Sequence, residues 1–113
     1  MATFINAYEK NRALVIEFRT STIMDEATVQ QVGKELDSVV GLTTHSLVVV
    51  DMSKLEMMTS SMLGRLVKFQ KRCEGDNIDL RLCQLSKDIA KLFKVTRLEK
   101  VFTIKSTLAK ASG

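Results

Sequence analysis

Three consecutive hydroxyl side chains, Thr59, Ser60 and Ser61, are the residues with the clearest chemical potential in this sequence. They come just before an apolar pattern with helical spacing that starts at Leu63. The first N–H groups of a helix lack intrahelical partners and the helix dipole is positive there, so this position can hold a serine oxygen or a phosphate. The pattern therefore predicts either a phosphoacceptor or simple helix caps, and the local spacing alone favours caps.

The apolar segment Leu47–Val50 precedes these hydroxyl residues and ends at Asp51. Its length and its β-branched content predict a strand buried on both faces. A polar loop that contains Ser53 connects this strand to the hydroxyl residues. We therefore interpret the strand, the loop and the start of the helix, up to Arg65, as one functional stretch.

The composition predicts one ordered domain spanning residues 1–113. Hydrophobic residues make up 45% of the 113, charged residues 27%, and proline is absent, which is ordinary for a globular protein. The formal charge of +4 is not concentrated in a dense basic block, so nucleic-acid binding is only weakly indicated. Because no window resembles a signal peptide or a membrane span, we expect a cytoplasmic protein without a membrane partner.

The sequence gives little support for catalysis. Cys73 and Cys83 are too few and too far apart for a zinc framework, and we expect them to be small, partly buried apolar residues. His45, the only histidine, lies in a polar loop where we expect a solvated side chain. Since no nucleophile has an activating partner at a diagnostic spacing, we predict no enzyme activity, metal or cofactor.

The pattern of apolar residues predicts the order β-β-α-β-α-β-α-β, with a possible final helix. Phe4, Tyr8, Leu14, Ile16 and Phe18 would share the buried face of an opening hairpin. The other expected elements are helices from Asp25 to Val40, Ser61 to Cys73 and Ser86 onward, strands at Leu47–Asp51, Ile78–Cys83 and Val101–Ile104, and a short helix within 106–111. We therefore predict an α/β fold, with a single-layer, mainly parallel mixed sheet on which the helices pack.

This element order and the segment DMSKLEMMTSSMLGRL resemble the STAS domain, which occurs in bacterial anti-sigma factor antagonists and in sulfate transporter tails. The family pattern is a strand ending in Asp-Leu-Ser, a spacer, and Asp-Ser-Ser-Gly-Leu-Gly opening a helix. Two of the six positions in the second part differ, because Thr59 replaces its Asp and Met62 replaces its first Gly. The other residues of the pattern correspond to Asp51, Met52, Ser53, Ser60, Ser61, Leu63 and Gly64, with Met52 in the position of the Leu.

The resemblance implies a partner-switching role. In such antagonists the dephosphorylated form binds an anti-sigma factor that is also a serine kinase, and phosphorylation of the first motif serine, here Ser60, ends that binding. A phosphatase would reverse the step. Other STAS proteins act as docking scaffolds, so a scaffold that is not phosphorylated remains an alternative, as does a small regulatory protein that binds a nucleotide or another anion at Ser60 and Ser61.

The resemblance also implies which residues meet the partner. Thr59 and Ser61 are alternative phosphoacceptors, and at least one of Met57, Met58 and Met62 is expected in the core. Arg65 is either a solvated cation or a group that steers an acidic partner or holds a phosphate. The residues predicted to bind the partner are Asp51, Ser53, Met58, Thr59, Ser60, Ser61, Met62 and Arg65.

Overall fold

The computed structural model describes residues 3–112. The strands are β1 (Ile5–Lys10), β2 (Ala13–Phe18), β3 (Thr22–Ile23), β4 (Leu47–Asp51), β5 (Met57–Met58), β6 (Asp79–Cys83) and β7 (Thr103–Lys105). The helices are α1 (Glu26–Leu42), α2 (Ser60–Gly75), α3 (Lys87–Val95) and α4 (Leu108–Ser112), with a short 3₁₀ helix, η1 (Leu98–Lys100).

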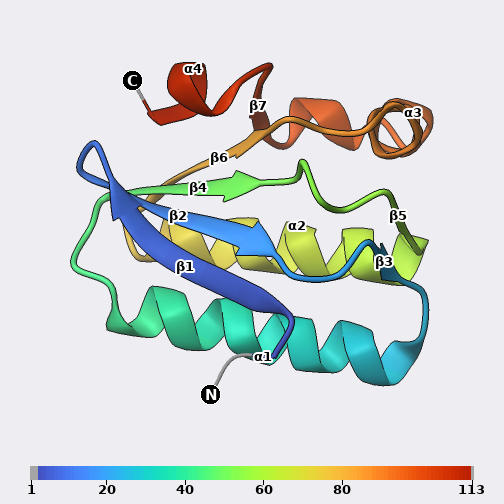
Figure 1. Cartoon of the computed structure of the whole chain (residues 1–113), viewed down its shortest axis with the longest axis horizontal. Coiled ribbons are helices and arrows are strands. Elements are labelled where there is room, and N and C mark those ends of the chain that lie inside the picture. Colours follow the sequence, from blue (N-terminus) through green and yellow to red (C-terminus); the bar gives the residue numbers. More distant parts are fainter. Residues whose placement is uncertain (1–2, 113) are drawn as a thin grey trace.

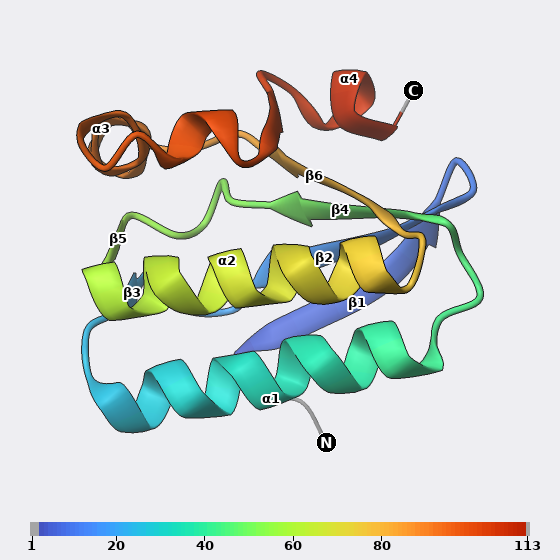
Figure 2. The same cartoon turned by 180° about the vertical axis from the view of Figure 1, so that it is seen from behind.

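Five strands form one mixed sheet in the order β1-β2-β4-β6-β7. Strand β1 is antiparallel to β2, and the other neighbouring strands are parallel. Helices α1 and α2 run side by side along one face, and α4 lies on the opposite side (Figures 1 and 2). The predicted α/β fold, with a mainly parallel sheet and an opening hairpin, is therefore confirmed.

The central strand β4 is buried on both faces, as its apolar sequence predicts. Val48 and Val50 point into the main core, to which α1, α2 and α3 contribute. Val49 belongs to a smaller apolar cluster on the other face, which includes Val15 and Ala111 of α4. Burial of both faces explains why this strand is a continuous apolar run and not an alternating one.

The hairpin forms, but Tyr8 lies on the other face from the one predicted. The two-residue turn at Asn11 and Arg12, both with positive φ, pairs Lys10 with Ala13. In this register Tyr8 pairs with Val15, and paired residues point to the same face of the sheet. Even-numbered residues of β1 therefore share a face with odd-numbered residues of β2. Tyr8 therefore packs against the smaller cluster, while Ile5 joins Leu14, Ile16 and Phe18 in the main core.

Several element boundaries differ from the predicted ones. Helix α1 continues through Gly41 to Leu42, and α2 continues to Gly75. Strand β7 starts at Thr103, two residues late, because η1 forms immediately before it. The tail does form the short helix α4, which covers the second face of the sheet.

A parallel two-stranded sheet, β3 with β5, forms where the sequence predicts only a loop before the hydroxyl residues. It pairs Ile23 with Met58, directly before α1 and α2 respectively. The Thr59 N–H also donates to the carbonyl of Ile23 at 3.1 Å. These contacts fix the starts of the two helices next to each other. None of the helices within residues 3–112 is long and apolar enough to cross a membrane.

Candidate functional site

Thr59 is the residue that caps α2. Its backbone is extended (φ −81°, ψ 164°), and its Oγ1 accepts a hydrogen bond from the Met62 N–H at 3.3 Å. A threonine cap satisfies one of the free donors of the first turn. Ser60 and Ser61 consequently lie inside the first turn of the helix and not before it.

Ser61 is held by a carboxylate from a different helix. Its Oγ donates to Glu26 Oε2 at 2.8 Å, across 35 residues of sequence. Hydrogen bonds from Gln30 and Ser61 lower the pKa of Glu26. The sequence gives no signal for this role of Glu26, because the helix dipole sufficiently explains an acidic residue in the first turn of α1.

Ser60 is exposed, and no hydrogen bond between described residues uses its hydroxyl. Its two neighbours are therefore engaged in helix capping and in the contact between helices, whereas Ser60 is available to another molecule. Of the three predicted acceptors, it is the one whose modification would disturb the fold least.

The methionines near the site divide into two groups. Met58 and Met62 are buried in the main core, which confirms that at least one of the three methionines points inward. Their burial contradicts the prediction that these two side chains contact a partner, since the core already surrounds them. Met57, which was not placed among the partner-binding residues, is 39% exposed.

Arg65 links α2 to α1 and is not part of the exposed site. Its Nη2 lies 2.5 Å from Asp37 Oδ2, and its side chain is only 12% exposed. It packs so closely on Gly33 that a Cβ atom there would lie 2.2 Å from its Nε. The prediction that Arg65 contacts a partner is therefore wrong for this conformation, because the guanidinium is already paired and covered.

Asp51 organises the loop after β4. It is buried, and its Oδ1 accepts hydrogen bonds from the Ser53 N–H and from Gln84 Nε2, both at 2.9 Å. An aspartate that binds the N–H two residues further on forms a local turn. Asp51 thus shapes the loop instead of meeting a partner directly, while Ser53 is exposed.

Three exposed apolar side chains come from the segments that directly precede α1 and α2 and from the end of α3. Met24, Met57 and Val95 are 56%, 39% and 72% exposed. Met57 and Val95 also line a shallow groove of about 310 Å³ between β5 and α3, together with Met58, Asp88, Lys91 and Leu92. We call Met24, Met57, Ser60 and Val95 the Ser60 surface. Exposed apolar groups beside an unused hydroxyl are typical of a protein-binding surface.

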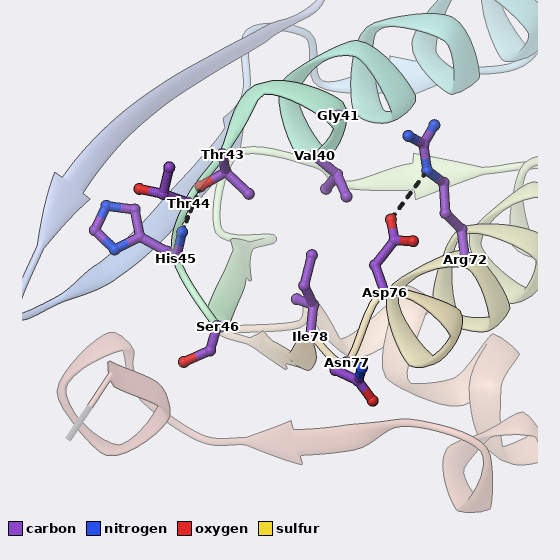
Figure 3. A pocket seen from close by; sticks show the side chains of 10 residues that line it. All are labelled: Val40, Gly41, Thr43, Thr44, His45, Ser46, Arg72, Asp76, Asn77 and Ile78. Atoms are coloured by element: carbon purple, nitrogen blue, oxygen red, sulfur yellow. Dashed lines mark hydrogen bonds and ion pairs between the residues drawn. The ribbon is translucent and has the colours of Figure 1, made fainter.

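A second hollow, of about 360 Å³, lies at the opposite end of α2 (Figure 3). Its charged side chains pair within the chain. Arg72 Nε lies 3.6 Å from Asp76 Oδ2, and Arg72 Nη1 lies 3.7 Å from Asp37 Oδ1. His45 Nε2 lies 2.6 Å from Glu9 Oε1. His45 is therefore a mostly covered, paired side chain, and the expectation of a solvated histidine is wrong.

The two cysteines are buried and free. Burial raises the pKa of both thiols to about 11, with smaller contributions from Asp76 at Cys73 and from Asp51 at Cys83. Such thiols stay protonated near neutral pH and behave as small apolar groups. Within residues 3–112, no three His, Cys, Asp or Glu side chains are grouped as metal ligands would be.

Comparison with known proteins relates this chain and its fold to one family. The sequence model of the STAS domain matches residues 4–111. A STAS domain protein described as an anti-sigma-factor antagonist, from Planctomyces limnophilus, superposes with a TM-score of 0.82 at 23% identity, covering 96% of this chain and 93% of that one.

Two further solved structures have the same fold. An anti-sigma factor antagonist from Mycobacterium paratuberculosis has a TM-score of 0.78 at 18% identity and covers 95% of this chain and 88% of its own. The phosphorylated form of SpoIIAA, a Bacillus cell fate determinant, has a TM-score of 0.67 at 16% identity, with 95% of each chain covered. At these identities the likeness establishes the fold.

Proposed function

Because this chain belongs to the STAS domain family, we propose that it is a regulatory binding module of the anti-sigma factor antagonist type. In this proposal its partner is an anti-sigma factor that is also a serine kinase, and the partner docks on the Ser60 surface. Phosphorylation of Ser60 ends the binding, and a phosphatase restores it. The observation that supports this most is the free, exposed hydroxyl of Ser60 between two engaged hydroxyl residues.

The chemistry of the site suits a switch that leaves the fold intact. A phosphate on Ser60 adds about 1.5 to 2 negative charges, and the positive end of the α2 dipole stabilises negative charge at this position. The hydroxyl makes no contact that the fold would lose. Modification therefore costs the free domain little.

The same charge is unfavourable in a complex. Met24 and Met57 would lose their contact with water when a partner covers them, and a dianion beside them would have to be desolvated as well. Glu26, held next to the site by Ser61, adds a like charge. Phosphorylation would therefore weaken binding without unfolding the module.

Thr59 can cap α2 in place of the Asp of the family pattern. Aspartate and threonine are both good N-caps, and Thr59 does cap α2. The nearby carboxylate comes from Glu26 of the neighbouring helix. The substitution is thus compatible with a working switch, with Ser60 as the acceptor.

Phosphate transfer provides the direct test. The purified chain is incubated with Mg-ATP and each anti-sigma-type kinase encoded in the same genome, and phosphate is located by mass spectrometry. We expect transfer to the wild type and to Ser61→Ala and Thr59→Val, and none to Ser60→Ala. Binding of a kinase without transfer to Ser60 would favour a docking scaffold, and transfer to Ser61 or Thr59 alone would contradict the assignment.

A further inference from the structure

The basic charge of this protein is concentrated at its C-terminal end. Residues 86–113 contain seven basic and two acidic residues, a formal charge of +5. Residues 1–85 contain ten basic and eleven acidic residues, a charge of −1. The segment from α3 to α4, orange to red in Figure 1, runs along one side of the molecule. That side is therefore electropositive, although the charge of the whole chain is modest.

These cations are not neutralised by the fold. All seven side chains are exposed, and none forms an ion pair with a described residue, unlike Arg65, Arg72 and Arg81 elsewhere in the chain. The seven are Lys87, Lys91, Lys94, Arg97, Lys100, Lys105 and Lys110.

Helix α3 presents its lysines away from the core. Ile89 and Phe93 are its buried residues, whereas Lys87, Lys91 and Lys94 follow the i, i+4, i+7 spacing of a single stripe on the opposite side. Ala90 lines a groove. Lys87 and Lys94 lie about one helical turn before and after Ala90, so the lysine stripe borders this groove.

This groove, with a volume of about 660 Å³, lies between α3 and β7. Its apolar lining includes Phe93 and Phe102, whose ring centroids are 5.4 Å apart in a tilted arrangement, and Leu85 and Ile104. Lys105 also lines it, together with the polar Gln84 and Ser106 and the acidic Glu99. The groove therefore offers an apolar floor next to unpaired cations.

The sheet is also open at this point. Strand β7 is the last strand in the order β1-β2-β4-β6-β7, so only one of its edges is paired within this sheet. An open edge can accept an extended segment of another chain through backbone hydrogen bonds. Strand β7 is short and carries one lysine, Lys105. Its charge disfavours pairing of the edge with a neutral or basic segment but attracts an acidic one.

We propose that α3 and β7 form a second docking surface, which binds an acidic segment of a partner protein. An apolar side chain of that segment contacts the half-buried Leu85 and Ile104 that line the groove. Its carboxylates face Lys87, Lys94 and Lys105. A second copy of this chain is disfavoured because residues 1–85 carry a charge of only −1. A nucleic acid would leave the apolar floor unused, since the two phenylalanines are buried and offer no exposed ring for base stacking.

This surface is separate from the Ser60 surface. Ala90 and Phe93 line the groove toward β7, whereas Asp88, Leu92 and Val95 line the groove toward β5. Helix α3 stands between the two grooves. The domain could therefore hold one partner constantly while exchanging another at Ser60.

The test uses a fluorescein-labelled acidic peptide with a central Leu-Phe pair and a second peptide in which Ser-Ser replaces that pair. Fluorescence anisotropy follows the binding of both to the full chain at low and physiological salt. We expect the Leu-Phe peptide to bind more tightly, and the triple variant Lys87→Glu, Lys94→Glu, Lys105→Glu to lower its affinity by at least about tenfold. The matched control, Lys10→Glu, Lys34→Glu, Lys68→Glu, carries the same change in charge on other exposed elements and should retain most of the affinity.

Four results would overturn the proposal: no binding even at low salt, equal binding of both peptides, equal losses in both triple variants, or tighter binding of duplex DNA or of phosphatidylserine vesicles. Thermal unfolding of each variant shows that it is folded. If the charge-reversal variant unfolds, single Lys→Gln replacements at the three positions give the same comparison, and each should weaken binding.

Discussion

Both ends of helix α2 carry polar side chains, but the two ends differ in whether these side chains are already bonded within the chain. At the C-terminal end, Arg72, Asp76 and His45 line a hollow, and all three pair with groups of the same chain (Figure 3). At the N-terminal end, Ser60 stands exposed and unused beside Met57. The charged groups of the hollow are therefore already paired within the chain, whereas the hydroxyl of Ser60 is not.

The difference arises from what holds each end in place. Ion pairs of Arg72 with Asp37 and Asp76 hold the C-terminal end, so these charges already have partners within the chain. The β3–β5 pair and the cap at Thr59 fix the N-terminal end, so the hydroxyl of Ser60 is not needed to hold this end in place. Four substitution experiments test this contrast between the two ends.

Truncating the buried and the exposed methionine should have very different effects on stability. Met62→Ala removes a fully buried side chain and should lower the free energy of unfolding by about 2–5 kcal/mol. Met57→Ala should change it by less than about 0.5 kcal/mol but weaken partner binding. Urea unfolding monitored by circular dichroism measures both. Similar stability losses in the two variants would mean that Met57 is also a core residue.

A negative charge should matter at one end of α2 and not at the other. Ser60→Glu should weaken kinase binding by about 2 kcal/mol or more, roughly thirtyfold, because the charge must be desolvated in the complex. Ser46→Glu, at an exposed serine beside the hollow, is the matched control and should bind like the wild type. Isothermal titration calorimetry compares them. If Ser46→Glu weakened binding as much, the partner would have to dock at the other end.

The cap of α2 should have a moderate effect. Thr59→Ala should cost about 1 kcal/mol of stability, because the Met62 N–H loses its acceptor. Thr59→Asp should keep or raise stability, since aspartate caps well and also favours the positive helix end. Ser60→Ala is the matched control. A loss in Ser60→Ala as large as in Thr59→Ala, measured by thermal unfolding, would show that Ser60 is used by the fold after all.

The contact between His45 and Glu9 at the far end should contribute least. Glu9→Gln changes an exposed side chain that can still accept a hydrogen bond, so it should lower the free energy of unfolding by less than about 0.5 kcal/mol. Urea unfolding measures the loss. A loss as large as that of Thr59→Ala would mean that this contact holds the hollow together.

Much of the fold follows from local sequence patterns. Asp25 and Ser86 cap helices as expected, and Leu47–Asp51 is the predicted strand. The face of Tyr8 could not be obtained from spacing, because it depends on the register that the turn at Asn11 and Arg12 imposes. The β3–β5 pair is two residues long on each side, too short for any periodic signal.

The position of the candidate site along the chain follows from local patterns. A strand, a polar loop and three hydroxyl residues at a helix start depend on neighbours within about one helical turn, and such local preferences are readable from the chain. Which of the three hydroxyls is free depends instead on contacts between distant segments. Ser61 is occupied by Glu26 at a separation of 35 residues, and Arg65 by Asp37 at a separation of 28. Contacts between distant segments exist only once the sheet and the β3–β5 pair have brought the two helices together.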